Sequence, residues 1–307
     1  METATLILSR KDNVHADAVA DNLTKKGSVI RRVNFDLEKS EKKNFPLVNF
    51  GKENQHFDSI FIHHPRVSYN PAWFIDDLER KLFVASWSSV PEWAESQFNE
   101  GLWINKPSAN QKSKNVLGQV KLATSVGFQT PDTLFTNNIE ELRAFAGKDT
   151  IVIKQGNLGV HMEKQRILTS VVNIASVDAD MLTSCPCLFQ KYVHKAFELR
   201  IHVINDTVLT CKIDSQSNEK TRIDWRDYDI PNTPHSIFDI DDTTRKKCIS
   251  LLKNMGLSFG VIDAIITPED DLVFLECNAQ GHWLWIEELT HLPITETLCE
   301  YLFSGRG

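Results

Sequence analysis

The first hundred residues alternate between short apolar runs and segments of helical pattern. The runs TLILS, SVIRRVNF and DSIFIH have the composition of β-strands, and a helical pattern covers residues 13–26 between the first two. Strands that alternate with helices predict a small parallel α/β domain, which we expect to end near residue 105. Residues 39–55 are charged, rich in Asn and aperiodic, and we interpret them as a surface excursion.

The remainder of the chain changes from helical to strand-rich patterns. We interpret WINKPSANQKSKN as a linker that leads into a helix through about Val126, which Gly127 ends. The motif Asn138-x-x-Glu141 has the spacing of a capping box and predicts another short helix. Strands dominate from Cys187 onward, interrupted by a helix expected at about residues 243–254.

The segment SFGVIDAIITPEDDLVFLECN predicts a hairpin, because two β-rich runs flank the turn-forming sequence PEDD. If the turn is centred between Glu269 and Asp270, Asp263 lies directly across from Glu276, and Asn278 lies one step diagonal to it. Directly opposed residues have Cβ atoms about 4.5 to 5.5 Å apart. Two bare carboxylates at that separation repel each other, so we expect a cation between them.

Alternation along the second strand places Phe274, Glu276 and Asn278 on one face and their neighbours on the other. Oxygen ligands without His or Cys suit Mg²⁺, which shares its coordination sphere with nucleotide phosphates. Two alternatives remain: an acid pair with a raised pKa, or solvated acids on a half-exposed edge strand.

A second hairpin is predicted in FELRIHVINDTVLTCKID, with its turn at Asn205-Asp206. On the first strand, apolar residues alternate with Glu198, Arg200 and His202. If polar positions stay together across the pair, the return strand adds three residues to that face. They are Thr210, Lys212 and Asp214. Such a charged floor suits a phosphate and a carboxylate; the alternative is an exposed sheet face with ordinary ion pairs.

Two further segments complete a candidate nucleotide site. Lys154 ends the β-rich run IVIK and precedes QGNLG, where Gly156 and Gly159 allow a flexible loop over phosphates. The apolar strand at residues 188–193 offers backbone groups to an adenine edge. The alternatives are a solvent-exposed Lys and an ordinary core strand. Neither GxxxxGK[ST] nor GxGxxG occurs, which excludes a P-loop and a Rossmann phosphate turn.

Composition narrows the classes of protein further. With 307 residues, 41% hydrophobic and 24% charged, the chain is long enough for two or three packed substructures. The apolar run in METATLILSR is too short for the core of a signal peptide, and no later segment could span a membrane. We therefore expect a cytoplasmic protein. The six cysteines are scattered and favour reduced core thiols. A net charge of −7 argues against nucleic acid as a partner.

The order of these motifs resembles that of the ATP-grasp ligases, with a strand Lys, a Gln-x-Tyr-Val hinge, an E-x-R strand and Asp and E-x-N metal ligands. More narrowly, PDTLFTNN, LFQKYVHKAFELR, DWR at residues 224–226 and ECNAQGHWLWIEE are similar to the graspetide maturases, relatives of the microviridin ligases that cyclise ribosomal peptides. The likeness covers about residues 105–307. The first hundred residues match mainly as a small α/β cap, with SIFIHHPR where such enzymes place a strand carrying basic residues.

The resemblance implies an α/β (α+β) protein with an ATP-grasp fold, ATP and Mg²⁺ as cofactors, and three domains. These are an N-terminal parallel α/β domain at 1–105, a central lid domain at 106–186 and a C-terminal mixed-sheet catalytic domain at 187–307. It implies metal ligation by Asp263, Glu276 and Asn278. The implied nucleotide-binding residues are Lys114, Lys154, Gln190, Lys191, Tyr192, Val193, Glu198 and Lys212. The implied catalytic residues are Arg200, Asp214 and Arg226, the last two toward the peptide, with a structural ion pair as the alternative for them.

The sequence departs from the family at two positions. Val116 stands where members often carry the first ATP lysine, which leaves Lys114 or Lys112 for that role. His282 stands where Gln is expected after the glycine.

The activity implied by the resemblance is ATP-dependent peptide cyclisation. Asp or Glu side chains of a ribosomal precursor, with a leader and an acidic Thr/Ser-containing core, become acyl phosphates and are joined to hydroxyls as ω-esters. Lys-directed amides, addition of free amino acids to an acceptor, and a non-enzymatic nucleotide-binding module are the alternatives. A homodimer also stays open.

Overall fold

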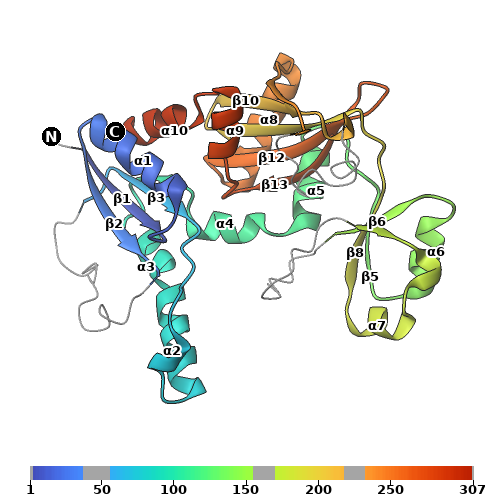
Figure 1. The fold of residues 1–307 in the computed structure, drawn as a ribbon, viewed down its shortest axis with the longest axis horizontal. Coiled ribbons are helices and arrows are strands. Elements are labelled where there is room, and N and C mark those ends of the chain that lie inside the picture. The colour runs from blue at the N-terminus through green and yellow to red at the C-terminus, as the bar shows by residue number, and fades with distance from the viewer. Residues whose placement is uncertain (1–2, 37–55, 155–169, 218–231, 306–307) are drawn as a thin grey trace.

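The structure is a computed structural model, and it describes residues 3–36, 56–154, 170–217 and 232–305. The surface excursion expected at residues 39–55, the loop with Gly156 and Gly159, and Arg226 of the DWR motif lie outside the described residues. The described residues form three β-sheets, each with its own helices (Figure 1).

The first sheet is parallel and has the strand order β2-β1-β3-β4, which confirms the small parallel α/β unit. Its strands are β1 (Thr3–Ser9), β2 (Ser28–Asn34), β3 (Ser59–His63) and β4 (Leu102–Ile104). Helix α1 (Val14–Lys25) connects β1 to β2 and starts at Asn13, whose side chain accepts hydrogen bonds from the amides of His15 and Ala16. It buries His15, Ala16, Val19 and Leu23, the spacing of an amphipathic helix.

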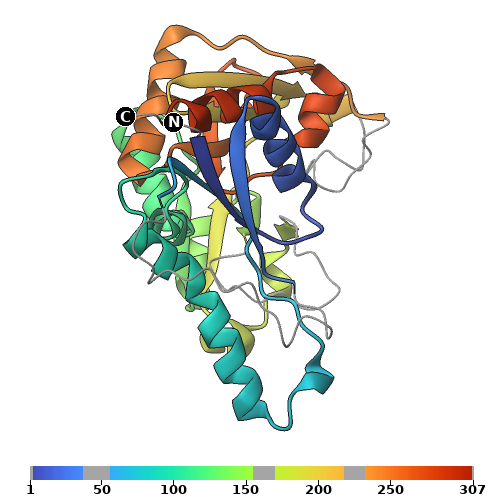
Figure 2. The ribbon, with the colours of Figure 1, turned by 90° about the vertical axis from the view of Figure 1, so that its left-hand side faces the viewer.

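Between β3 and β4 the chain forms helices that the sequence analysis did not include. They are the 3₁₀ turn η2 (Pro71–Trp73) and helices α2 (Asp77–Ser88) and α3 (Val90–Gln97). Helix α2 extends away from the first sheet and buries none of its side chains (Figures 1 and 2). Leu78 and Leu82 are among the apolar side chains that it exposes.

The segment interpreted as a linker is largely helical. Helix α4 (Pro107–Ser113) begins with proline in its first turn, where the missing amide proton removes no helical hydrogen bond. Helix α5 (Val116–Ser125) follows after Asn115, which caps it, and ends before Gly127 at φ 90°. The expected helix end at Gly127 is confirmed. The interpretation of the preceding segment as a linker is wrong, because Pro107 was taken as a loop residue and is instead the start of a helix.

The second sheet is antiparallel with the strand order β5-β8-β6-β7. Its strands are β5 (Thr133–Thr136), β6 (Ile151–Lys154), β7 (Ser170–Val172) and β8 (Cys187–Lys191). Two helices pack on this sheet, α6 (Ile139–Ala146) and α7 (Ala179–Ser184), and they contribute Leu142 and Leu182 to its core. A 3₁₀ turn, η3 (Ile174–Ser176), lies between β7 and α7. Asn138 caps α6 as expected. The expected central domain ends at residue 186, but β8 (Cys187–Lys191) is an interior strand of this sheet, so the sheet includes residues beyond 186.

The third sheet is also antiparallel, with the order β11-β10-β9-β12-β13. Its strands are β9 (Phe197–Ile204), β10 (Thr207–Ile213), β11 (His235–Ile237), β12 (Phe259–Ile266) and β13 (Leu272–Asn278), with the 3₁₀ turn η4 (Ser215–Ser217) after β10. Helix α8 (Asp242–Met255) covers one face through Leu251 and Leu252, as the expected helix at residues 243–254 should. Two further helices, α9 (Leu284–Thr290) and α10 (Ile294–Phe303), pack with α1 on the other face.

In the described parts of the chain, no helix has the length and apolar character needed to cross a membrane.

Asn105 joins the first sheet to the third. It follows β4 and is 1% exposed. Its Nδ2 donates to the carbonyls of Phe259 at 2.8 Å and Ala279 at 2.9 Å. Its Oδ1 accepts from the amides of Ser258 at 2.8 Å and Phe259 at 2.9 Å. One side chain therefore uses its full hydrogen-bonding capacity on the backbone of a distant sheet.

Candidate functional site

The β12–β13 hairpin brings the expected metal ligands together. Asp263 pairs directly with Glu276, and Asn278 pairs with Val261 one step further along, so this register is confirmed. Asn278 Nδ2 lies 3.2 Å from Asp263 Oδ2 and 3.2 Å from Glu276 Oε1. The neutral amide thus donates to both carboxylates, and these hydrogen bonds offset part of their mutual repulsion without supplying a cation.

A β-bulge changes the face assigned to Phe274. The pairing shifts between Asp263 and Ala264, so that Ala264 faces Phe274. Phe274 therefore points to the α8 side with Cys277, where it is fully buried, and does not share the face of Glu276. The strict alternation expected for β13 was wrong at this point, because a bulge adds a residue and reverses the order of faces beyond it.

Gln119 of α5 fixes the backbone between the two ligands of β13. Its Oε1 accepts from the Cys277 amide at 2.7 Å, and its Nε2 donates to the Cys277 carbonyl at 3.0 Å. The side chain is 5% exposed. Because Cys277 lies between Glu276 and Asn278, this amide pair orients the strand that carries both.

Arg200 lies next to the same carboxylates. Its Nη1 donates to Asp263 Oδ1 at 2.8 Å, and its Nη2 donates to the His282 carbonyl at 2.9 Å. The guanidinium carbon lies 5.7 Å from the ring centroid of Trp285. Two residues earlier, Glu198 forms an ion pair with Lys195 at 2.6 Å, with both side chains buried. The E-x-R face is therefore buried, and an exposed sheet of ordinary ion pairs is excluded.

The β9–β10 hairpin turns at Asn205-Asp206 as expected, but its register separates the charged residues. Cys211 pairs with Arg200 and Ile213 pairs with Glu198. The neighbouring Thr210 and Lys212 therefore lie on the opposite face, and Lys212 Nζ sits 4.2 Å from the centroid of the Phe197 ring. A two-residue turn pairs even-numbered residues of one strand with odd-numbered residues of the other. Because both faces of this sheet are buried, the polar residues of the two strands did not have to share a face, and the register predicted from polarity was wrong.

Asp214 does not lie in the return strand. It follows the end of β10, and its amide donates to the Pro234 carbonyl at 3.0 Å. The structure therefore does not place Asp214 beside Arg200 on the sheet face, although its assigned role toward the peptide stays a prediction.

The remaining nucleotide-binding candidates lie on the second sheet or near it. Lys154 ends β6, and the buried Gln190 of β8 donates to Thr133 Oγ1 at 3.0 Å. Lys191 pairs with Asp149 at 2.8 Å and with Asp132 at 3.5 Å. The Tyr192 amide donates to the Thr150 carbonyl, and Val193 lies in the segment that connects β8 to β9. Lys114 caps α4 and contacts Gln111.

A cluster of imidazoles lies beside this site and was not expected from the sequence. His63 ends β3, His64 follows it, and His15 is in the first turn of α1. The ring of His282 lies 4.7 Å from that of His15 and 5.6 Å from that of His63, measured between centroids. A sequence signal did exist, since the carboxyl end of a parallel strand beside a helix N-terminus is where such α/β units place functional groups.

The imidazole of His202 on β9 is completely buried, and burial lowers its pKa well below 6.5, with smaller contributions from Arg200 and, in the opposite direction, the Leu209 carbonyl. An imidazole that stays neutral in the folded state but takes a proton when unfolded stabilises the fold above pH 6.5, and this stability is lost as the pH falls. The free energy of unfolding should therefore fall as the pH is lowered, and His202→Leu should make this fall less steep by about 1.4 kcal/mol per pH unit below about pH 6.

Urea denaturation between about pH 7 and pH 5 measures this slope. His291→Asn serves as the control, because His291 is exposed and Asn also tolerates its φ of 59°. An unchanged slope in His202→Leu would contradict the assignment.

The arrangement of all three sheets matches that of known structures. A RiPP-associated ATP-grasp ligase from Chryseobacterium gregarium, solved with ADP and a leader and core peptide, matches with a TM-score of 0.84 and 25% sequence identity. The match covers 100% of this chain and 98% of that one. The chain has the ATP-grasp fold.

Other proteins with this ATP-grasp fold resemble the chain as completely. The macrocyclase MdnC from Microcystis aeruginosa MRC, bound with precursor peptide MdnA, has a TM-score of 0.82 and 24% identity over 98% of this chain and 99% of its own. The ATP-grasp ligase PsnB, complexed with a phosphomimetic variant of minimal precursor, Mg and ADP, has a TM-score of 0.77 and 18% identity over 100% of both chains. No family model and no curated protein matches the sequence. The fold that the order of motifs implied is confirmed.

Proposed function

We propose that this chain is an ATP-dependent, ADP-forming peptide macrocyclase. It would activate Asp or Glu side chains of a ribosomally made precursor peptide and join them to Thr or Ser hydroxyls as ω-esters. The observation that carries the proposal is the meeting of Asp263, Glu276 and Asn278 beside Arg200. The fold adds support, because similar structures were solved with ADP and with precursor peptides.

The residues of the β12–β13 hairpin fit a magnesium ion. Asn278 Nδ2 occupies the point between the two carboxylates, and a half-turn of its amide would present Oδ1 there instead. Three oxygen ligands, with Glu276 half-buried and Asn278 exposed, leave room for water and phosphate oxygens. When bound, Mg²⁺ would supply charge stabilisation for the transferring phosphoryl group.

The nucleotide would lie between the second and third sheets. We assign Lys154 to the phosphates and the segment from Gln190 to Val193 to the adenine, with Glu198 below them at the start of β9. Arg200 is held by Asp263 and the His282 carbonyl, so its position is set before substrate binds. Such a fixed guanidinium can offset charge on the transferring group without reorganisation.

The proposed reaction has two steps. An oxygen of the peptide carboxylate attacks the γ-phosphorus of ATP, the bond to the β-phosphate oxygen breaks, and ADP leaves. A hydroxyl of the same peptide then attacks the acyl carbon, releasing phosphate and a proton. Arg226 and Asp214 are assigned to the peptide, the first as a partner of its acidic side chains and the second as an acceptor for the hydroxyl proton.

Mass spectrometry of the peptide product tests this function. With ATP, Mg²⁺ and a peptide encoded beside this chain, one with a leader and a Thr/Ser- and Asp/Glu-rich core, we expect loss of one water per ring and ADP release only when peptide is present. Mild alkali should restore the water, because esters hydrolyse readily and amides do not.

Each alternative has its own outcome in the same experiment. Rings that resist alkali and map to a Lys would replace the ester by an amide. A mass gain would indicate addition of free amino acids, and ADP release without peptide would contradict a peptide ligase.

A further inference from the structure

Three histidines from two parts of the chain converge at one point. His63 and His64 lie at the carboxyl end of β3, and His282 lies in the turn after β13. One ligand nitrogen from each lies within 4.8 Å of those of the other two. The turn is held close to β12, since a Cβ on Gly281 would come within 2.5 Å of Val261 Cγ2. The tight packing of Gly281 therefore holds the adjacent His282, whose side chain is exposed, toward β3.

The His64 ring has a defined tautomer. Its Nε2 lies 2.8 Å from the carbonyl oxygen of Gln280, and because a carbonyl only accepts, Nε2 carries the proton. The lone pair is then on Nδ1. A metal-binding histidine in proteins commonly donates its second ring N–H to a carbonyl in this way.

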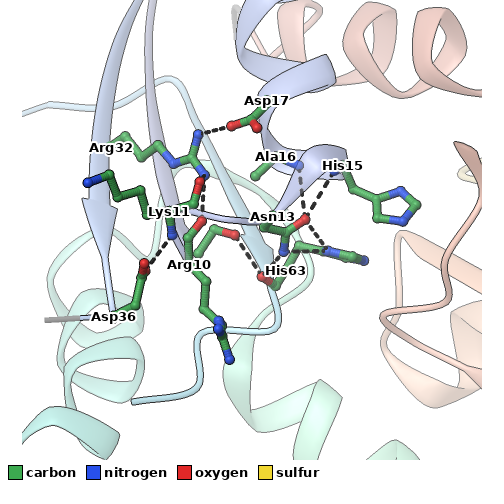
Figure 3. A network of polar contacts seen from close by, with 10 residues as sticks. Arg10, Lys11, Asn13, His15, Ala16, Asp17, Arg32, Asp36 and His63 are labelled. Carbon is green, nitrogen blue, oxygen red and sulfur yellow. Dashed lines mark hydrogen bonds and ion pairs between the residues drawn. The ribbon is translucent and has the colours of Figure 1, made fainter. Parts of the chain in front are cut away.

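The His63 ring is fixed by the helix cap of α1. His63 Nδ1 lies near both amide atoms of Asn13, 3.0 Å from Nδ2 and 3.3 Å from the helix-capping Oδ1, and Nδ2 donates to the His63 carbonyl at 2.9 Å (Figure 3). In the tautomer in which Nδ1 donates to Asn13 Oδ1, the lone pair is on Nε2. His63 Nε2 is buried and makes no hydrogen bond of normal geometry to the described residues, although the Gly281 carbonyl lies close enough to affect its pKa. A buried ring nitrogen without such a partner is costly unless something else occupies the position.

The pKa values of three of these imidazoles are lowered. Burial, together with the neighbouring imidazoles, lowers the pKa of His15 to about 3 and that of His64 to about 4, and brings that of His63 well below 6.5. A neutral imidazole keeps one nitrogen lone pair, which is the form that binds a metal.

We propose that His63, His64 and His282 bind one transition-metal ion of the Zn²⁺ class, at a site separate from the carboxylates of the β12–β13 hairpin. Tetrahedral Zn–N bonds of about 2.0 to 2.1 Å place ligand nitrogens about 3.3 Å apart. From a greatest separation of 4.8 Å, the rings must close by about 1.5 Å at most. Rotation of the exposed His282 about its χ angles supplies that movement, and water completes the coordination.

The metal would tie the first sheet to the turn that orients Arg200. His282 contributes its ring to the metal and its carbonyl to Arg200 Nη2, which also binds Asp263. Occupancy would therefore restrain the loop beside the proposed phosphate site. This inference does not depend on the proposed function, because the three rings converge whether or not a peptide is the substrate.

Titration of the metal-free protein with Co²⁺, without nucleotide, tests the site. We expect one equivalent to bind, with the visible absorption of a four- or five-coordinate Co²⁺ that Zn²⁺ then displaces, and a higher melting temperature. His64→Ala and His282→Ala should each weaken binding by at least about 100-fold, since each removes one of three ligands.

Two variants serve as controls. His56→Ala removes an imidazole that is 74% exposed and outside the cluster, and should bind Co²⁺ normally. Glu276→Gln should also bind it normally, which separates this site from the magnesium ligands. Circular dichroism confirms that each variant is folded. No stoichiometric binding, or binding that survives both histidine substitutions in folded protein, would overturn the proposal.

Discussion

Glu276→Gln is expected to lower peptide-dependent ADP release by at least about 100-fold without a change in fold. The substitution keeps the volume of the side chain but removes one of the two anionic charges that face each other across β12 and β13. Glu276 is only half-buried, and a glutamine keeps a side-chain oxygen that can accept from Asn278 Nδ2, so the substitution should cost little stability. The loss should therefore appear in turnover at saturating Mg²⁺ and not in the melting temperature.

Asp263→Asn should lose activity equally and also melt at a lower temperature, because Asp263 is the buried partner of Arg200. Glu269→Gln is the matched control, since Glu269 is exposed in the turn of the same hairpin. Turnover in Glu276→Gln close to that of Glu269→Gln would disprove the magnesium site.

Asn105→Asp is expected to reduce the free energy of unfolding by about 3 kcal/mol or more at neutral pH. The exchange is isosteric, but it replaces two N–H donors by an oxygen that faces the carbonyls of Phe259 and Ala279. Both carbonyls lose a buried partner, and a carboxylate without a cation is buried in their place. Protonation of that carboxyl restores one donor, so the defect should shrink as the pH is lowered.

Urea denaturation at two pH values measures the effect. Asn99→Asp provides the comparison, because Asn99 is exposed and accepts from Lys106 Nζ through Oδ1, a contact that an aspartate keeps. If both variants unfold at the same urea concentration, Asn105 does not hold the first and third sheets together.

The two hairpins show how far a register can be predicted from sequence. Asp263 lies across from Glu276 as predicted, but the pairs next to the turn, such as Ile266 with Leu272, are one residue out of the predicted register, and the extra residue of the bulge restores it at Asp263. The bulge itself has no signal in the sequence, and Phe274 was assigned to the wrong face for that reason. In the second hairpin, the turn position was right, but polarity was a poor guide to the face because β9 is buried on both sides.

The C-terminal helices and the convergence of the histidines were not predicted from the sequence, for different reasons. Helices α9 and α10 have Trp283 and Pro293 at their N-cap positions, and neither side chain caps the helix, so the usual start signal is missing. The cluster depends on the distance between β3 and the turn at Gly281, which only the packing of the first sheet against the third determines. The metal ligands could be anticipated because a single local turn brings them together.

The contacts of β13 also bear on how a peptide can approach. β13 is the outer strand of the third sheet, and an outer strand ordinarily offers unpaired N–H and C=O groups to another extended chain. Here Gln119 takes both backbone groups of Cys277, and the Gln129 carbonyl accepts the Phe274 amide. The edge nearest the carboxylates is thus already occupied by the protein itself. An incoming peptide cannot extend this sheet as an added strand at these positions, and must be gripped through its side chains or on another surface.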